Sequence, residues 1–173
     1  MSIHGISTAA TPQLGHYTVD TAGSRVTFRT RHMFGLAPVR GRFALRSGTV
    51  DIAEPIAESG VRFEAEAATF HTGNPLRDGT VLSAKFLHSD RYPLLTFVSA
   101  GLDGTTLTGE LTAHGVTRTV AFTIEPDSVA TAPDSFTARA TTRIDRTEFG
   151  VTAQRGLAGR YLNVVVEVRC VKR

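Results

Sequence analysis

One stretch interrupts the pattern of the whole chain: Thr72-Gly-Asn-Pro-Leu-Arg-Asp-Gly-Thr-Val-Leu-Ser-Ala-Lys-Phe86. Nearly all the sequence on either side alternates apolar and polar residues with a period of two, which is the pattern of a half-buried β-strand. Within this stretch Asn74 can cap a helix N-terminus, and Pro75 suits the first helical position, where the missing N–H would be unpaired anyway. We therefore predict one short helical lid near the middle of an otherwise all-β chain.

The predicted helix has an apolar stripe made by Leu76, Leu82 and Phe86. Gly79 lies in the middle of the segment, and glycine weakens a helix interior relative to alanine. We therefore expect the lid to consist of two short helical pieces separated at Gly79.

The rest of the chain predicts strands that each have one apolar face. In the segment Arg25–His32, for example, Val26 and Phe28 alternate with Arg25 and Arg29. The other expected strands lie at 15–20, 40–46, 50–52, 60–67, 95–100, 106–113, 116–125, 136–144 and 161–171.

Short turns join most of these segments, which favours antiparallel neighbours around one enclosed core. A sandwich and a closed barrel both satisfy this pattern. About eight strands with one short helix favour an antiparallel lipocalin-like β-barrel. A length of 173 residues is ordinary for one domain. We therefore predict a single barrel domain over residues 15–173, after a disordered N-terminal tail over residues 1–14.

Composition excludes some classes of partner. Hydrophobic residues make up 41% and charged residues 20% of the chain, as in ordinary globular proteins. Tryptophan is absent, which argues against a stacking platform for single-stranded nucleic acid. The net charge is +3, and several arginines are spread through the strands rather than forming a run. These cations could attract an anionic headgroup or surface, although solvated outer strand faces are the plainer interpretation; they are Arg25, Arg29, Arg31, Arg40, Arg42 and Arg46.

The single cysteine and the first residues bear on location. Cys170 falls on the apolar side of the last strand, has no partner for an internal disulfide and is expected to be a small buried core residue. Residues 1–13 contain neither a basic region nor an apolar run of the length that a signal peptide or membrane span needs. We expect a cytoplasmic protein with no membrane insertion.

The inward faces mix large and small side chains. An eight-stranded barrel is near the limit at which side chains either fill the interior or leave room for one slender ligand. The small inward residues, which include Ala65, Gly109 and Ala138, favour leftover apolar space that accepts a hydrophobic guest. They are equally compatible with a packed core in which each small residue faces a phenylalanine.

Motifs for catalysis are weak. The histidines His32, His71, His88 and His114 lack the spacing of metal ligands, and the chain has no nucleophile elbow, P-loop or dinucleotide fingerprint. We predict no catalytic residue, no metal and no cofactor.

Several short stretches together resemble the YceI-like family of polyisoprenoid-binding proteins, in the family's order and over about Tyr17 to Val168. They are Tyr17-Thr-Val-Asp20, Ser24-Arg-Val-Thr-Phe28, His32 with Gly41-Arg-Phe43, Thr72-Gly-Asn74 with Arg77-Asp78, Tyr92-Pro-Leu-Leu-Thr-Phe97, Leu107-Thr-Gly-Glu-Leu-Thr112, His114-Gly-Val-Thr117, Ile144-Asp-Arg146 and Phe149-Gly150.

The resemblance implies a lipocalin-like barrel whose apolar channel holds one isoprenoid or fatty-acid-like chain, for binding, storage or transport. Gly79-Thr80 and Lys85-Phe86-Leu87 depart from the family's usual residues, so we expect a lid that is looser or differently selective. We expect His32, Arg77 and Arg146 to contact the ligand's polar head. The residues predicted to line the channel are Phe28, Phe43, Phe63, Phe97, Leu111, Phe122 and Phe136.

Two other functions stay open. One is an enzyme of lipid or quinone metabolism in which His32 or His114 pairs with Asp78, which requires the side chains to converge within hydrogen-bonding reach or through one water. The other is a packed barrel that serves only as an interaction module, for example as a homodimer formed through an exposed apolar strand face such as Val165 and Val171.

Overall fold

The computed structural model describes residues 10–33, 35–154 and 156–173. Its α-helix is α1 (Pro75–Leu82), and four short 3-10 turns are η1 (Ile56–Glu58), η2 (Ala67–Thr69), η3 (Pro126–Ser128) and η4 (Arg146–Phe149). The strands are β1 (Gly15–Val19), β2 (Arg25–His32), β3 (Ala37–Phe43), β4 (Leu45–Ile52), β5 (Gly60–Glu66), β6 (Leu94–Asp103), β7 (Thr106–Ala113), β8 (Val116–Ile124), β9 (Ala130–Ala132), β10 (Ser135–Asp145) and β11 (Tyr161–Lys172).

Within the described residues, eight strands form a closed antiparallel ring. The pairing runs β11–β1–β4–β5–β6–β7–β8–β10 and returns to β11 through the long β10–β11 ladder. The predicted lipocalin-like barrel of about eight strands is therefore confirmed. Closure leaves no open sheet edge along this ring, which removes a route to edge-to-edge aggregation.

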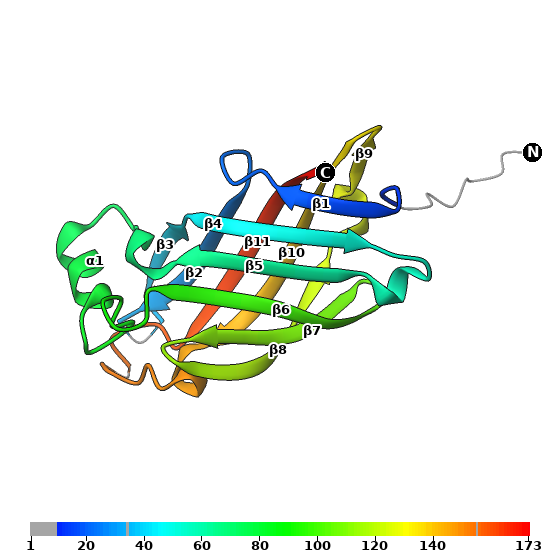
Figure 1. Cartoon of the computed structure of the whole chain (residues 1–173). Helices are drawn as coiled ribbons and strands as arrows, with labels where there is room; N and C mark the ends of the chain where they lie inside the picture. The colour runs from blue at the N-terminus through cyan, green and yellow to red at the C-terminus, as the bar shows by residue number, and fades with distance from the viewer. Residues whose placement is uncertain (1–9, 34, 155) are drawn as a thin grey trace, which may run out of the picture.

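The hairpin β2–β3 extends the barrel wall at one end. Strand β2 pairs with Asn163–Glu167 of β11, whereas β1 pairs with Cys170–Lys172 of the same strand. Both strands thus follow one edge of β11, one after the other. The wall is consequently longer on the β2–β3 side, at the end where α1 lies (Figure 1).

The helix caps one end of the barrel and the η1 turn lies at the other (Figure 1). The chain runs from β5 through η2 and α1 before it returns in β6, so the lid replaces the tight turn of a simple hairpin. In Figure 1 the connection between β10 and β11, drawn in orange, lies at the same end as α1.

The helix α1 differs from the prediction because Gly79 does not divide it. It is one continuous helix, and residues 83–92 form hydrogen-bonded turns rather than a second helix. The predicted cap is confirmed, since the Asn74 side chain accepts a hydrogen bond from the Arg77 backbone N–H. Gly79 faces open space, so its missing side chain removes no packing contact, and capping outweighs its low helix propensity.

The strand expected over residues 40–46 is also interrupted. Strand β3 ends at Phe43 and β4 begins at Leu45, because the chain changes partners there, from β2 to β1 and β5. Between them, the Ala44 N–H donates to the Thr69 hydroxyl at 2.8 Å instead of joining a ladder. A period-two pattern cannot reveal such a change, because the side chains keep alternating through it.

Two apolar clusters pack inside the barrel. One contains Tyr17 and Phe136, whose rings meet edge to face at 4.9 Å, and it includes the fully buried Cys170. The other contains Phe97 and Phe122, with ring centroids 5.0 Å apart. The prediction that Cys170 is buried is confirmed, and burial raises the pKa of its thiol to about 12.

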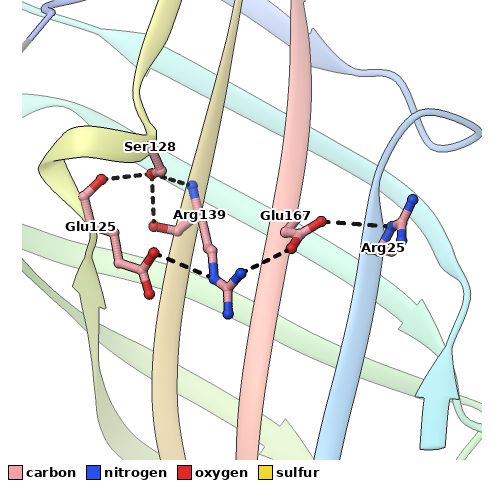
Figure 2. Close-up of polar contacts among 5 residues, drawn as sticks. All are labelled: Arg25, Glu125, Ser128, Arg139 and Glu167. Atoms are coloured by element: carbon pink, nitrogen blue, oxygen red, sulfur yellow. Dashed lines mark hydrogen bonds and ion pairs between the residues drawn. The ribbon is translucent and has the colours of Figure 1, made fainter.

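The shortest backbone ladder in the ring joins β8 to β10. Only two residue pairs, Ala140–Ile124 and Thr141–Thr123, share this ladder in the described chain. Side chains supplement it on the outer surface, as Figure 2 shows: Arg139 lies between Glu125 and Glu167, at 3.4 Å from each. The Ser128 hydroxyl accepts from the Arg139 N–H at 2.9 Å and donates to the Glu125 carbonyl at 2.6 Å.

We expect Ser128→Ala to lower the free energy of unfolding by about 1 kcal/mol, because it leaves the Arg139 N–H without its side-chain acceptor. Denaturant unfolding of the purified variant measures the effect. The control is Glu167→Gln, which weakens exposed ion pairs and should cost about 0.5 kcal/mol or less. An equal or larger loss in Glu167→Gln would show that the ion pairs, and not the serine, hold the seam.

Candidate functional site

The barrel contains an apolar cavity of about 560 Å³ under the lid, with a mouth at that end of the barrel. This volume lies within the range of small-molecule binding pockets, about 300–1,000 Å³. Every strand of the wall except β1 and β9 contributes side chains, together with α1, the turn after it and the segment between η4 and β11. Most of the lining residues are aliphatic or aromatic, and they include Val26, Phe28, Val39, Phe43, Leu45, Phe70, Phe86, Leu95, Phe97, Leu111, Ile144, Phe149, Leu162 and Val164.

Strand β2 shows how the sequence builds the wall. Its predicted inward residues all line the cavity, from Val26 through Phe28 to His32. The Phe28 ring stacks on Phe70 at 5.2 Å and crosses Gly41 of β3. A side chain at Gly41 would collide with that ring, so this glycine sets the position of the aromatic wall.

Phe63, Phe122 and Val166 form the floor of the cavity. These three residues also line a second, smaller cavity of about 220 Å³ on the opposite side. The bore is therefore two chambers with a waist between them, rather than one open channel. The sequence was compatible with a packed core and with a hollow one. The structure has both, because side chains pack at the waist and a cavity lies on each side of it.

Part of the segment that the sequence assigned to a disordered tail contributes to the wall of the second chamber. Ala10, Thr11 and Pro12 line it, and the Gln13 carbonyl accepts a hydrogen bond from the Tyr17 hydroxyl at 2.8 Å. Residues 1–9 of the predicted tail lie outside the described residues.

Polar contacts at its N-terminus fasten the lid. Asp78 accepts hydrogen bonds from the N–H and the hydroxyl of Thr72, at 3.1 and 2.5 Å. The same hydroxyl accepts from Nε of Arg77 at 2.9 Å. His71 lies 3.7 Å from Asp78 and pairs through its backbone with Arg42 at the end of β3. The motif Thr72-Gly-Asn74 with Arg77-Asp78 therefore joins the lid to the barrel wall.

The polar groups of the cavity gather near this lid. Strand β2 contributes His32, the lid contributes Asn74, Arg77 and Thr80, and the segment after η4 contributes Gln154. Arg77 is half-buried, so its side chain can face both the cavity and solvent. A ligand with one polar end would place that end here and its apolar remainder against the walls.

Arg146 is buried, with 8% of its surface exposed, and its guanidinium hydrogen bonds to backbone. It donates to the carbonyls of Val151 and Ala153 at 2.8 Å, Gly159 at 2.7 Å and Ala158 at 3.3 Å. It also lies over the Phe86 ring at 5.5 Å. Arg146 lines the cavity as expected, but these hydrogen bonds hold the segment between η4 and β11, which forms one side of the cavity's mouth.

Asp145, the residue before Arg146, is paired with Arg160. The distance from Arg160 to its carboxylate is 3.0 Å, and Thr147 donates to the same carboxylate through its N–H and hydroxyl. Burial alone would raise the pKa of Asp145, but the hydrogen bonds from Arg160 and Thr147 outweigh it and keep that pKa below its usual value. This carboxylate therefore stabilises the fold above its unfolded pKa, and that stabilisation is lost as the pH falls through the lowered value.

The structure brings together nearly all the residues that the sequence assigned to the ligand. Phe136 is the exception, since it lines the second chamber only. The residues that do line the main cavity are Phe28, His32, Phe43, Phe63, Arg77, Phe97, Leu111, Phe122 and Arg146.

Sequence reasoning missed one side of the mouth. Gln154, Leu157 and Ala158 line the cavity, yet they lie in an irregular segment with no period-two or helical pattern. The one residue nearby that could have indicated a close contact is Gly159. Its backbone passes so close to Thr30 of β2 that a side chain would not fit.

The residues of the enzyme hypothesis have other partners. Asp78 contacts Thr72 and His71, and His114 lies against the Phe149 carbonyl at 3.1 Å and the Tyr92 ring at 4.9 Å. The proposed dimer residues Val165 and Val171 are half-buried on β11.

The described part of the chain holds neither a cluster of metal-ligand side chains nor a helix that could span a membrane. No group of three or more histidine, cysteine, aspartate or glutamate side chains there is arranged to hold a metal ion. No helix in the same part of the chain is long and apolar enough to cross a membrane.

These features define a class of protein, a closed eight-stranded barrel with a lidded apolar cavity. The model of the YceI-like domain matches residues 17–170, and the chain accordingly belongs to the YceI-like family. Protein YceI of Escherichia coli is 28% identical over 91% of this chain and 87% of its own length. A UPF0312 protein of Vibrio parahaemolyticus is 27% identical over 93% of this chain and 89% of its own length.

Solved structures share the fold. BcnA of Burkholderia cenocepacia superimposes with a TM-score of 0.71 at 23% identity, covering 87% of this chain and 98% of its own. A polyisoprenoid binding domain from Saccharophagus degradans, implicated in plant cell wall breakdown, gives a TM-score of 0.72 at 14% identity, covering 93% of this chain and all of its own.

Proposed function

We propose that the protein binds one long-chain lipid, with an isoprenoid or fatty acyl tail, in the cavity under the lid. The observation that carries the proposal is a cavity of about 560 Å³ whose lining is mostly aliphatic and aromatic. Apolar cavities of this kind stay dry and accept apolar guests. The polyisoprenoid binding domain that shares the fold supports the same ligand class.

The arrangement of polar groups suggests how the ligand lies. The tail would extend toward the waist at Phe63, Phe122 and Val166, and the head would lie near His32 and Arg77. Transfer from water is worth about 0.8 kcal/mol per methylene, so a tail of about 20 carbons offers on the order of 15 kcal/mol gross. Ordering the flexible tail removes much of this gain, and the binding is therefore strong but reversible.

Reversible binding suits storage or transport of the lipid rather than permanent attachment. The polar contacts at the N-terminus of α1 hold the lid at one end, and Leu76, the second residue of this helix, lines the cavity with 86% of its surface exposed. The tail would enter past this exposed residue. The proposal assigns the chain no reaction.

Native mass spectrometry of the purified protein tests this function. After organic extraction, the protein is incubated with farnesol, a longer polyprenol, palmitate and, as a polar control, glucose. We expect one lipid per chain for at least one of the long-chain compounds and none for glucose, because burial of apolar surface drives binding. Failure to retain any lipid, in a protein shown to be folded by its thermal transition, would contradict the proposal.

A further inference from the structure

The mouth of the cavity carries a cluster of exposed apolar side chains. It consists of Met33 and Leu36 at the β2–β3 turn, Leu76 on α1, and Leu157 before β11, with exposed fractions of 54%, 84%, 86% and 51%. Two of these segments touch, because the Met33 N–H donates to the Leu157 carbonyl at 2.7 Å. Leu76 and Leu157 also line the cavity, so the cluster forms its outer rim. Grouped exposed apolar residues of this kind mark interaction sites.

Beside this rim, the outer face of the β2–β3 hairpin is strongly basic. Arg29 of β2 stands directly opposite Arg40 of β3, and both are exposed. The exposed side chains of Arg31 and Arg42 flank this pair. The same register continues across Asn163 of β11 to Arg143 of β10. The row Arg40–Arg29–Asn163–Arg143 therefore crosses four strands without a carboxylate.

Like charges directly opposite one another destabilise a sheet unless an anion lies between them. The nearby carboxylates already have other partners. Glu167 lies between Arg25 and Arg139 (Figure 2), and Asp145 pairs with Arg160. Among the described residues, no ion pair is formed by Arg29, Arg40 or Arg143. The face is thus complementary to a dense array of external anions.

Tyr161 lies at the edge of the same face. It is 40% exposed, with the guanidinium of Arg143 4.0 Å and that of Arg160 5.1 Å from its ring centroid. Tyrosine has an apolar ring with a polar tip, and it is enriched at membrane–water interfaces for that reason.

We propose that this face docks on the surface of an anionic phospholipid bilayer, with the mouth of the cavity turned toward the lipid. The rim Met33, Leu36, Leu76 and Leu157 enters the boundary between headgroups and acyl chains, and the arginine row contacts phosphates. No segment crosses the bilayer in this arrangement. The passage of cargo between bilayer and cavity rests on the function proposed above, whereas the docking itself is separate and is tested separately.

Co-sedimentation with two kinds of vesicle tests the docking. One kind is phosphatidylcholine alone, and the other is phosphatidylcholine mixed with phosphatidylglycerol. We expect binding to the mixed vesicles, weakening as sodium chloride is raised, because exposed charges are screened. An arginine near an anionic surface contributes roughly a fivefold gain in affinity, so removal of two should weaken binding at least tenfold.

The principal variant is Arg29→Glu with Arg40→Glu. Its matched control is Arg62→Glu with Arg173→Glu, which makes the same change of net charge at exposed positions outside the hairpin. A third variant, Leu36→Ser with Leu76→Ser, removes apolar rim contacts. We expect the hairpin and rim variants to lose vesicle binding and the control to keep it. Equal loss in hairpin and control variants, or equal binding to both kinds of vesicle, would overturn the proposal.

A lipid-uptake measurement separates this proposal from the function of the cavity. The hairpin variant should still take up a long-chain lipid from detergent solution, because Arg29 and Arg40 do not line the cavity. Vesicle binding by a wild-type protein that takes up no lipid would support docking and contradict the carrier function. Lipid uptake by a wild-type protein that shows no preference for anionic vesicles would support the carrier function and contradict the docking. Unchanged thermal transitions confirm that each variant is folded.

Discussion

Replacing Leu111 with tryptophan should reduce affinity for a long-chain lipid by more than tenfold. Leu111 projects from β7 into the main cavity and is only half-buried, so its side chain adjoins open space rather than a packed neighbour. An indole there takes the room of about three methylene groups of the guest, each worth about 0.8 kcal/mol, which predicts a loss of about 2 kcal/mol. Displacement of a fluorescent fatty acid, read as a change in Kd, measures the effect.

The control for this prediction is Glu110→Trp on the same strand. Glu110 is exposed and its side chain points outward, so the same new residue occupies no part of the cavity. We expect lipid affinity to stay within twofold of wild type. If Leu111→Trp bound lipid as well as this control, the cavity would not be the binding site.

Replacing Arg146 with leucine should lower the free energy of unfolding by about 3–5 kcal/mol. The guanidinium donates hydrogen bonds to four backbone carbonyls, and leucine offers no donor to replace it. Arg146→Lys should restore little of the loss, because an ammonium cannot reproduce the planar set of donors. Denaturant unfolding measures the change, and the mouth segment should also become more accessible to protease.

Arg160→Leu is the comparison for Arg146→Leu. Arg160 is exposed and pairs with one carboxylate, Asp145, so its loss should lower the stability far less than the loss of Arg146 does. Similar losses in the two variants would mean that the buried guanidinium holds the mouth no more firmly than a surface ion pair does.

The barrel could be predicted from sequence because its strands alternate so regularly. In β11 the inward residues are apolar at every second position from Leu162 to Cys170, and a one-residue shift would turn all of them to solvent. The helix start was equally predictable, since Asn74 and Pro75 act locally. Gly79 misled the prediction because propensity is a weak signal beside capping.

The cavity was harder to predict because its limits depend on contacts between distant segments. Alternation places Phe136 inside the barrel correctly, but it does not say on which side of the waist. The division at Phe63, Phe122 and Val166 arises from packing among three strands far apart in sequence. Arg146 lines the cavity as predicted, yet its hydrogen bonds to the mouth segment could not be foreseen, because Gln154 to Gly159 carry no repeating pattern.

The burial of the single cysteine makes the protein convenient to label at a chosen site. Cys170 is completely buried, and burial raises the pKa of its thiol to about 12, so it stays protonated and out of reach of maleimides at neutral pH. A cysteine introduced at the exposed Leu76 would therefore be the only thiol that takes up a dye. Such a dye would report the arrival of cargo or of a bilayer at the entrance, with the native thiol left in place.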